Sequence, residues 1–169
     1  MIYPIVKYGD PVLEKPAAAI TAFDDDLRKL VDDMFESMYA AHGVGLAAPQ
    51  IGISKRIAVI DVTFKEDPDA KIVLVNPEIV HTEGKLTSTE GCLSLPEFRE
   101  NVTRPRKVTA RAQDVNGKTI EVTGEELLAR ALVHETDHLN GKLYISCISA
   151  LKRDMIKRKV RKLIKQGEW

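Results

Sequence analysis

The chain has 169 residues, of which 44% are hydrophobic and 30% charged. This composition is typical of one folded domain, here 1–169, and excludes disordered, collagen-like and membrane-spanning proteins. Its 25 basic and 25 acidic residues give a formal charge of zero, so we expect no general attraction to DNA or to a membrane. Two cysteines and no signal peptide predict reduced thiols and a cytoplasmic protein.

The first half of the chain predicts one helix and two strands. Residues 1–20 contain three prolines among scattered apolar residues, which predicts an extended arm without a helix. Three aspartates and then apolar residues at helical spacing predict an amphipathic helix between 24 and 43. The runs 56–62 and 71–75 are rich in β-branched residues and predict strands, and Pro77 is expected to end the second one.

The second half predicts a hairpin followed by two helices. Residues 107–113 alternate in polarity and predict a strand, and 119–123 are expected to form the antiparallel strand that pairs with it. The Asn-Gly pair at 116–117 predicts a type I′ turn between them. A helix is expected over 125–140, and another is expected to begin with Ser149 as its cap. The predicted fold class is therefore α+β, with short antiparallel strands around a central helix.

The helix expected over 125–140 contains the pattern HETDH. His134 and His138 lie one turn apart on a face that also carries Leu127 and Ala131, so both rings can bind one divalent ion. Glu135 lies beside this face among leucines. Burial there would raise its pKa while a nearby cation would lower it, and such a balance suits a general base.

A catalytic ion needs a third protein ligand. No histidine follows His138, and the acidic residues after it lie in or beyond a basic segment, so we expect the ligand to come from upstream. Cys92 stands between a glycine and a proline and is the candidate. For Cys147 we expect the role of a small buried apolar residue. We expect Asp137, near Arg130, either to form a structural ion pair or to contact the residues that hold the metal ligands.

Three motifs together carry a resemblance. Residues 43–50 (GVGLAAPQ) by themselves predict only a helix cap and a turn. Followed by 90–96 (EGCLSLP) and 134–139 (HETDHL), they resemble the three signature motifs of the peptide deformylase family, over nearly the whole chain. The resemblance implies an enzyme that removes the formyl group from N-formylmethionyl peptides at the start of new proteins and releases formate.

The resemblance also implies roles for individual residues. The implied metal ligands are Cys92, His134 and His138, around Fe²⁺ with Ni²⁺, Co²⁺ or Zn²⁺ as substitutes. Glu135 is the implied acid and base, and the implied oxyanion donors are Gln50 and the backbone amide of Leu93, with Gly45 beside them. The residues expected to bind the peptide, some from the helix face and others by resemblance, are Val44, Gly45, Glu90, Gly91, Arg99, Leu127, Arg130 and Ala131.

Residues 151–169 form a basic segment in an otherwise neutral chain, with apolar residues on the other side of the expected helix. The segment either packs as a C-terminal helix with a solvated face or contacts ribosomal RNA. Two other functions stay open at this point. One is a zinc metallopeptidase that cuts internal peptide bonds, and the other is a structural zinc module that binds RNA, with Cys147 as a fourth ligand.

Overall fold

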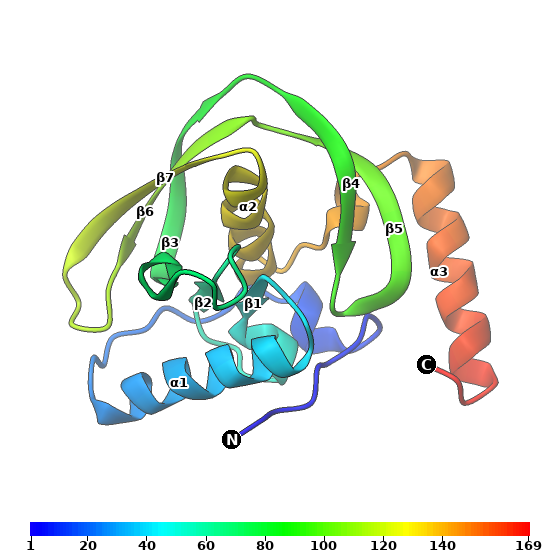
Figure 1. Cartoon of the computed structure of the whole chain (residues 1–169). Helices are drawn as coiled ribbons and strands as arrows, with labels where there is room; N and C mark the ends of the chain where they lie inside the picture. The colour runs from blue at the N-terminus through cyan, green and yellow to red at the C-terminus, as the bar shows by residue number, and fades with distance from the viewer.

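A five-stranded antiparallel sheet forms the centre of the computed structural model, which describes residues 1–169 (Figure 1). The strand order is β1-β2-β3-β6-β7. The bounds are Gly45–Ala47 for β1, Ile57–Ile60 for β2, Ile72–Glu83 for β3, Lys107–Gln113 for β6 and Thr119–Glu125 for β7. Helix α2, Leu127–Leu139, packs against all five of these strands.

A second, two-stranded sheet lies beside α2 (Figure 1). Strands β4 (Leu86–Cys92) and β5 (Leu95–Arg104) form this hairpin. Glu90 on β4 accepts hydrogen bonds from Arg130 and His134 of α2. Arg104 on β5 donates one to Asp137 of the same helix. The central helix is thus enclosed between two sheets, one of which the sequence did not predict.

Helix α1, Asp25–Ala40, packs against β1 and β2 and confirms the predicted amphipathic helix. The side chain of Asp24 caps it by accepting a hydrogen bond from the Leu27 amide at 3.0 Å. Its buried apolar residues are Leu27, Val31, Met34, Phe35 and Met38. They recur at the helical spacing that the sequence displays, so burial of one stripe fixes the helix on the sheet.

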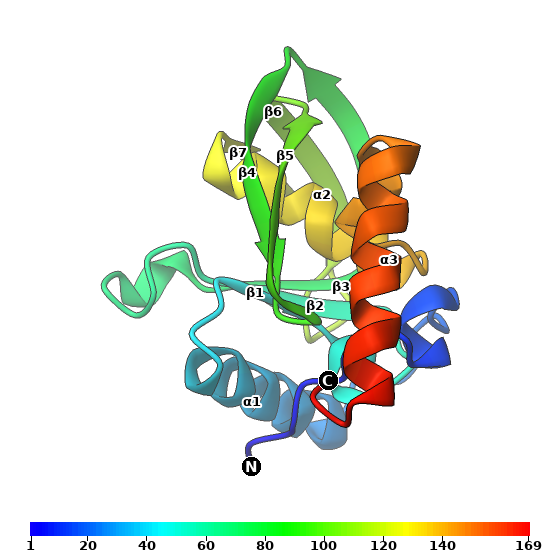
Figure 2. The same cartoon turned by 90° about the vertical axis from the view of Figure 1, so that its right-hand side faces the viewer.

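Helix α3, Ala150–Lys165, lies along the outer side of the β4–β5 hairpin (Figure 2). Ser149 caps it, as predicted, by accepting from the Lys152 amide at 3.2 Å. Only Ile156 and Val160 of this helix are buried, in a cluster with residues of the hairpin and of the N-terminal arm. Other apolar side chains remain exposed, Leu151 to 72%, because a helix on the outer surface buries a narrow stripe. No helix of the chain combines the length and the apolar character that a membrane crossing needs.

Two predictions in the first half were wrong. The arm contains a short 3-10 helix, Pro11–Glu14, whose first turn the Asp10 side chain caps. Pro77 does not end its strand, because β3 continues through it to Glu83 with a register shift between Val75 and Glu78. A bulge removes the need for a ladder hydrogen bond from proline, so proline is tolerated at that point.

The β6–β7 hairpin is present, but its turn is not of type I′. That turn needs a positive φ at both central residues, whereas only Gly117 of the pair has one, at 81°. The carboxylate of Asp114 instead accepts hydrogen bonds from the amides of Asn116 and Lys118. The aspartate thus organises a longer loop that ends in the left-handed glycine.

Candidate active site

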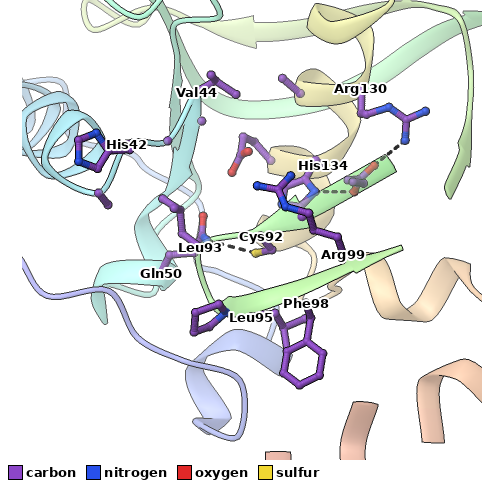
Figure 3. Close-up of a pocket in the computed structure, with 18 of the residues that line it drawn as sticks. His42, Val44, Gln50, Cys92, Leu93, Leu95, Phe98, Arg99, Arg130 and His134 are labelled. Atoms are coloured by element: carbon purple, nitrogen blue, oxygen red, sulfur yellow. Dashed lines mark hydrogen bonds and ion pairs between the residues drawn. The ribbon is translucent and has the colours of Figure 1, made fainter. Parts of the chain in front are cut away.

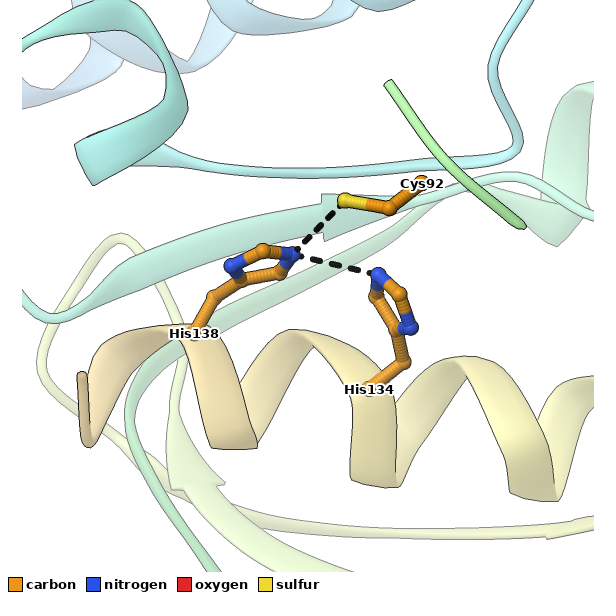
Figure 4. Close-up of side chains that lie close together, drawn as sticks. All are labelled: Cys92, His134 and His138. Atoms are coloured by element: carbon orange, nitrogen blue, oxygen red, sulfur yellow. Dashed lines mark hydrogen bonds between the residues drawn. The ribbon is translucent and has the colours of Figure 1, made fainter. Parts of the chain in front are cut away.

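Three ligand atoms converge between α2 and the end of β4 (Figure 4). One atom each from Cys92, His134 and His138 lies within 4.8 Å of the others. The Cys92 Sγ is 3.3 Å from His138 Nε2, and the two histidine Nε2 atoms are 3.1 Å apart. The structure therefore brings together the thiol and the imidazole pair predicted from the sequence as a metal site.

The charges around the two rings favour a cation between them. Burial opposes a charge on His134, but Glu135, Cys92 and Glu90 outweigh it and raise the pKa of His134. Burial and the neighbouring His134 lower the pKa of His138. Since His134 Nδ1 donates to the Glu90 carboxylate at 2.7 Å, its Nε2 is free to ligate. Two imidazole nitrogens and a soft sulfur form a donor set that fits a divalent transition metal.

Glu90 holds His134 in place and is itself held by four donors. Its Oε2 accepts from His134 Nδ1 at 2.7 Å and from Arg104 Nη2 at 2.9 Å. Its Oε1 accepts from Arg130 Nη1 at 2.7 Å and from Arg104 Nε at 3.2 Å. Burial would raise the pKa of Glu90, but the hydrogen bonds from His134 and Arg104 lower it overall. Asp137 pairs with Arg104 at 2.9 Å, not with Arg130 as predicted, because Arg130 turns toward β4.

Cys147 differs from its prediction. The residue is exposed rather than buried, and its Sγ accepts from Arg104 Nη1 at 3.5 Å. It does not belong to the group of potential metal ligands. The four-ligand site of a structural zinc module, which required Cys147, is therefore not formed.

An irregularity in the hairpin places Cys92 in the site. Gly91 pairs with Arg99, but Cys92 pairs with Leu95, so three residues of β5 bulge out opposite the junction. Glu97 within this bulge has a φ of 72°, in the left-handed region. A bulge of this kind re-aims neighbouring side chains, and here the thiol at the end of β4 is directed toward α2 (Figure 4).

Glu135 is buried beside the metal ligands, with 4% of its surface exposed. Its Oε1 has no hydrogen-bond partner within the protein. Burial raises the pKa of Glu135 to about 7, so the carboxyl group can both accept and release a proton near neutrality. A Cβ atom at Gly45 would lie 2.9 Å from Glu135 Cδ. The glycine of β1 therefore makes room for the carboxylate.

Gln50 presents an amide beside the thiol. The residue is 1% exposed, and its Oε1 accepts from the Ala47 amide at 3.0 Å. This bond directs the Nε2 donor toward Ser94 Oγ, at 3.2 Å, and toward Cys92 Sγ, at 3.6 Å. The Leu93 N–H makes no hydrogen bond to the backbone of the chain. The Leu93 N–H is thus available next to the metal ligands, and the Gln50 amide makes only a long contact with the thiol, at 3.6 Å, besides its bond to Ser94.

A cavity of about 560 Å³ opens from these groups to the surface (Figure 3). One stripe of α2 lines it, together with β1, β4 and the bulge of β5. Each peptide-binding residue expected from the sequence lines this cavity: Val44, Gly45, Glu90, Gly91, Arg99, Leu127, Arg130 and Ala131. No pattern in the sequence signalled the further lining residues, among them His42, Thr89, Glu97 and Phe98.

Comparison with known proteins identifies the family. The sequence model of the family described as polypeptide deformylase matches residues 2–154. The chain belongs to this family. A peptide deformylase of Acidobacterium capsulatum is 63% identical over 169 residues, which cover 100% of this chain and 99% of the relative. A second relative, from Thermodesulfovibrio yellowstonii, is 50% identical and aligns with 94% of this chain and 96% of its own.

Solved structures of the family have the same fold. A peptide deformylase from Legionella pneumophila superposes with a TM-score of 0.90 at 47% identity, covering 99% of this chain and 98% of that one. A peptide deformylase from Thermus thermophilus superposes with a TM-score of 0.88 at 38% identity, covering 99% of this chain and 98% of that one. The resemblance seen in the three motifs and the α+β fold class are both confirmed. The chain is an enzyme of the deformylase family.

Proposed function

We propose that this chain removes the formyl group from the N-formylmethionine of nascent polypeptides and releases formate in the cavity described above. The observation that carries the proposal is the convergence of Cys92, His134 and His138 beside a buried Glu135. The family of the chain supports the reaction class, and the cavity next to these groups offers room for a peptide terminus.

We infer that the ion is Fe²⁺, with Ni²⁺, Co²⁺ or Zn²⁺ as substitutes. When bound, the ion supplies Lewis acidity that activates water and polarises the formyl oxygen. The sulfur of Cys92 makes the donor set softer than three histidines would be, and it exposes an iron-loaded site to oxidation. We therefore expect the activity of the iron form to decay faster in air than under anaerobic conditions.

Glu135 is proposed to move the protons of the reaction. It accepts a proton from the attacking water and returns it to the amine that leaves as the C–N bond breaks. Its unpartnered Oε1 and its pKa of about 7 suit both steps. Gly45 supports this role because any larger residue would displace the carboxylate.

Gln50 and Leu93 are proposed to stabilise the negative charge that develops on the formyl oxygen. The Nε2 of Gln50 is held in place by the bond between its Oε1 and Ala47, and it would exchange its long contact with Cys92 Sγ, at 3.6 Å, for the formyl oxygen. The free N–H of Leu93 is the second donor. Donors that are already fixed in position stabilise the transition state more than water does, because water must reorient during the reaction.

The methionine side chain is proposed to enter the cavity between Val44, Leu127 and Ala131. An apolar slot suits a flexible thioether. Backbone groups near Gly45 and Gly91 can pair with the following residues as an added strand, which reads few side chains and predicts broad tolerance beyond the first residue. Glu90, Arg99 and Arg130 line the same cavity.

We further propose that the enzyme acts in the cytoplasm and meets its substrate at the ribosome. The basic side of α3 supports this, because most of its lysines and arginines are exposed. Contacts with RNA phosphates depend on such a surface and weaken with salt. The same helix also packs on the body of the protein through Ile156 and Val160, so removing it entirely would test stability as well as binding.

Formate release tests the function directly. Anaerobically purified protein, analysed for its metal, is incubated with formyl-Met-Ala-Ser and with acetyl-Met-Ala-Ser. We expect formate from the first peptide and no deacylation of the second. Cleavage within unformylated peptides without formate release would instead support the metallopeptidase.

A further inference from the structure

Trp169 connects the segment after α3 to the N-terminal arm, on the side of the arm that faces the candidate active site. We propose that Trp169 is a positioning residue for Gln50 and acts on it through this arm. The proposal rests on the proposed function, because it concerns a donor to the formyl oxygen. Trp169 lies outside residues 2–154, which the family model matches, so its role would be a feature of this chain.

The chain turns back toward the arm where α3 ends (Figure 2). Gly167 has a φ of 71°, and its amide donates to the Ile164 carbonyl oxygen at 3.1 Å. The Glu168 amide donates to the Leu163 carbonyl oxygen at 2.9 Å. These two bonds around a left-handed glycine end the helix and reverse the direction of the chain. Trp169 is therefore directed toward the body of the protein instead of away from it.

The half-buried indole of Trp169 contacts both the arm and β5. Its Nε1 donates to the Tyr8 carbonyl oxygen at 2.7 Å. Its ring meets the ring of Phe98 edge to face, with 6.0 Å between the centroids, and Phe98 lines the cavity. The Lys7 Nζ lies 5.8 Å from the centroid of the indole, within range of a cation–π contact. Because its apolar ring is packed and its single donor is satisfied, the indole fixes the arm against β5.

The arm is in turn bonded to Gln50 and to the residue on which the Gln50 amide rests. The Val6 amide donates to the Gln50 carbonyl oxygen at 2.7 Å, and the Tyr8 amide donates to the Ser94 carbonyl oxygen at 2.8 Å. Gln50 Nε2 donates to Ser94 Oγ at 3.2 Å. Tyr8 is thus held at its carbonyl group by Trp169 and holds Ser94 through its N–H. A shift of the arm would move Ser94 relative to Gln50 and change the direction of the Nε2 donor.

This set of contacts predicts an effect on kcat rather than on KM. The direction of Nε2 matters most when negative charge develops on the formyl oxygen, because a fixed donor acts on the transition state. The arm does not line the cavity, so loosening it removes no contact with the bound peptide. An interaction that is made only in the transition state lowers kcat and kcat/KM equally when it is lost.

The test is a double-mutant cycle of Trp169→Ala with Gln50→Glu, a substitution that removes the Nε2 donor. Trp169→Ala alone should lower kcat for formyl-Met-Ala-Ser by about threefold or more and leave KM within about twofold. In the Gln50→Glu background the same change should lower kcat by less than about 1.5-fold, because the donor that Trp169 positions is absent. Trp169→Phe keeps a ring next to Phe98 but has no N–H for Tyr8, so it should lower kcat by about twofold or more.

Amide hydrogen exchange gives a second readout that does not depend on activity. In Zn²⁺-loaded protein without peptide, Trp169→Ala should speed up exchange at the Val6 and Tyr8 amides by about tenfold or more, because local opening of the arm becomes easier. Leu151→Ala is the matched control, since Leu151 lies on α3 and is 72% exposed. It should change neither these exchange rates nor kcat.

Three results would overturn the proposal. They are unchanged exchange in Trp169→Ala, a wild-type kcat in Trp169→Phe, and equal loss of kcat on Trp169→Ala with and without Gln50→Glu. If the wild type released no formate, the proposed function would fail, and the exchange rates would still decide whether Trp169 holds the arm.

Discussion

The amide of Gln50 offers the sharpest test of the mechanism, because its two ends do different work. Its Oε1 accepts from Ala47, and its Nε2 is the donor near Cys92. In Gln50→Glu one oxygen can still accept from Ala47, and the other can accept from the Ser94 hydroxyl. The substitution therefore keeps both acceptor contacts while it removes the N–H donor that we propose for the formyl oxygen.

The expected loss follows from this geometry. Removing one fixed oxyanion donor typically costs ~2.7–4 kcal/mol, or a factor of about 10²–10³ in kcat. A second variant, Gln50→Met, also removes the acceptor of the Ala47 amide, and a buried unsatisfied amide costs about 1–3 kcal/mol of stability. For a chain of this size that corresponds to a fall in Tm of roughly 2–12 °C. Both variants lack the donor, so both should lose kcat by at least this factor of about 10².

The assay measures kcat and KM for formyl-Met-Ala-Ser, with the melting temperature and metal content of each variant. Gln113→Glu serves as the control, since this amide lies on β6 and bonds to Asn76 and Gly117 away from the cavity. It should leave kcat unchanged. A Gln50→Glu enzyme with full metal content and wild-type kcat would refute the role of Gln50 as a donor to the developing charge.

Four further outcomes are expected. Chelation should abolish formate release and readdition of Ni²⁺ should restore it, while Cys92→Ser should bind Ni²⁺ at least tenfold more weakly in titration because a soft ligand is lost. Burial would raise the pKa of Asp61, but hydrogen bonds, first that from Tyr39, lower it to about 2. Asp61 therefore stabilises the fold above about pH 4, and urea unfolding should show this contribution lost as pH falls toward 2, but not in Asp61→Asn. Combining Arg158→Glu with Lys162→Glu should weaken salt-sensitive ribosome sedimentation and leave hydrolysis of free peptides intact.

The helices could be predicted from the sequence, whereas the β4–β5 hairpin could not. Each helix carries an apolar stripe, and most of that stripe is buried in α1 and α2. Strand β4 reads LTSTEGC and exposes both of its faces over much of its length, so it lacks the alternation that signals a strand. Its pairing is supported by polar cross-strand contacts instead, between Thr87 and Thr103 and between Thr89 and Asn101. Such pairs are visible only once the register is known.

The metal ligands could also be predicted from the sequence, because their pattern is local. The residues that hold these ligands in place could not. The spacing of His134 and His138 is a property of one helix, and a missing third ligand left Cys92 as the candidate. The partners of Glu90 depend instead on how the hairpin sits against α2. Register places Arg104 opposite Leu86 rather than opposite Glu90, yet its long side chain reaches back to the carboxylate. The pairing of Asp137 was mispredicted because it depends on the same placement.

A gain in folding stability does not explain why charged side chains are buried around Glu90. Replacing a buried ion pair with well-packed apolar residues is often neutral or stabilising, because desolvation offsets most of the attraction. Glu90, Arg104 and Arg130 are each at most 6% exposed, so their desolvation cost is large. What apolar residues could not supply is an acceptor that fixes the tautomer and the ring plane of His134. The cluster is therefore best understood as the support that aims His134 Nε2 at the metal.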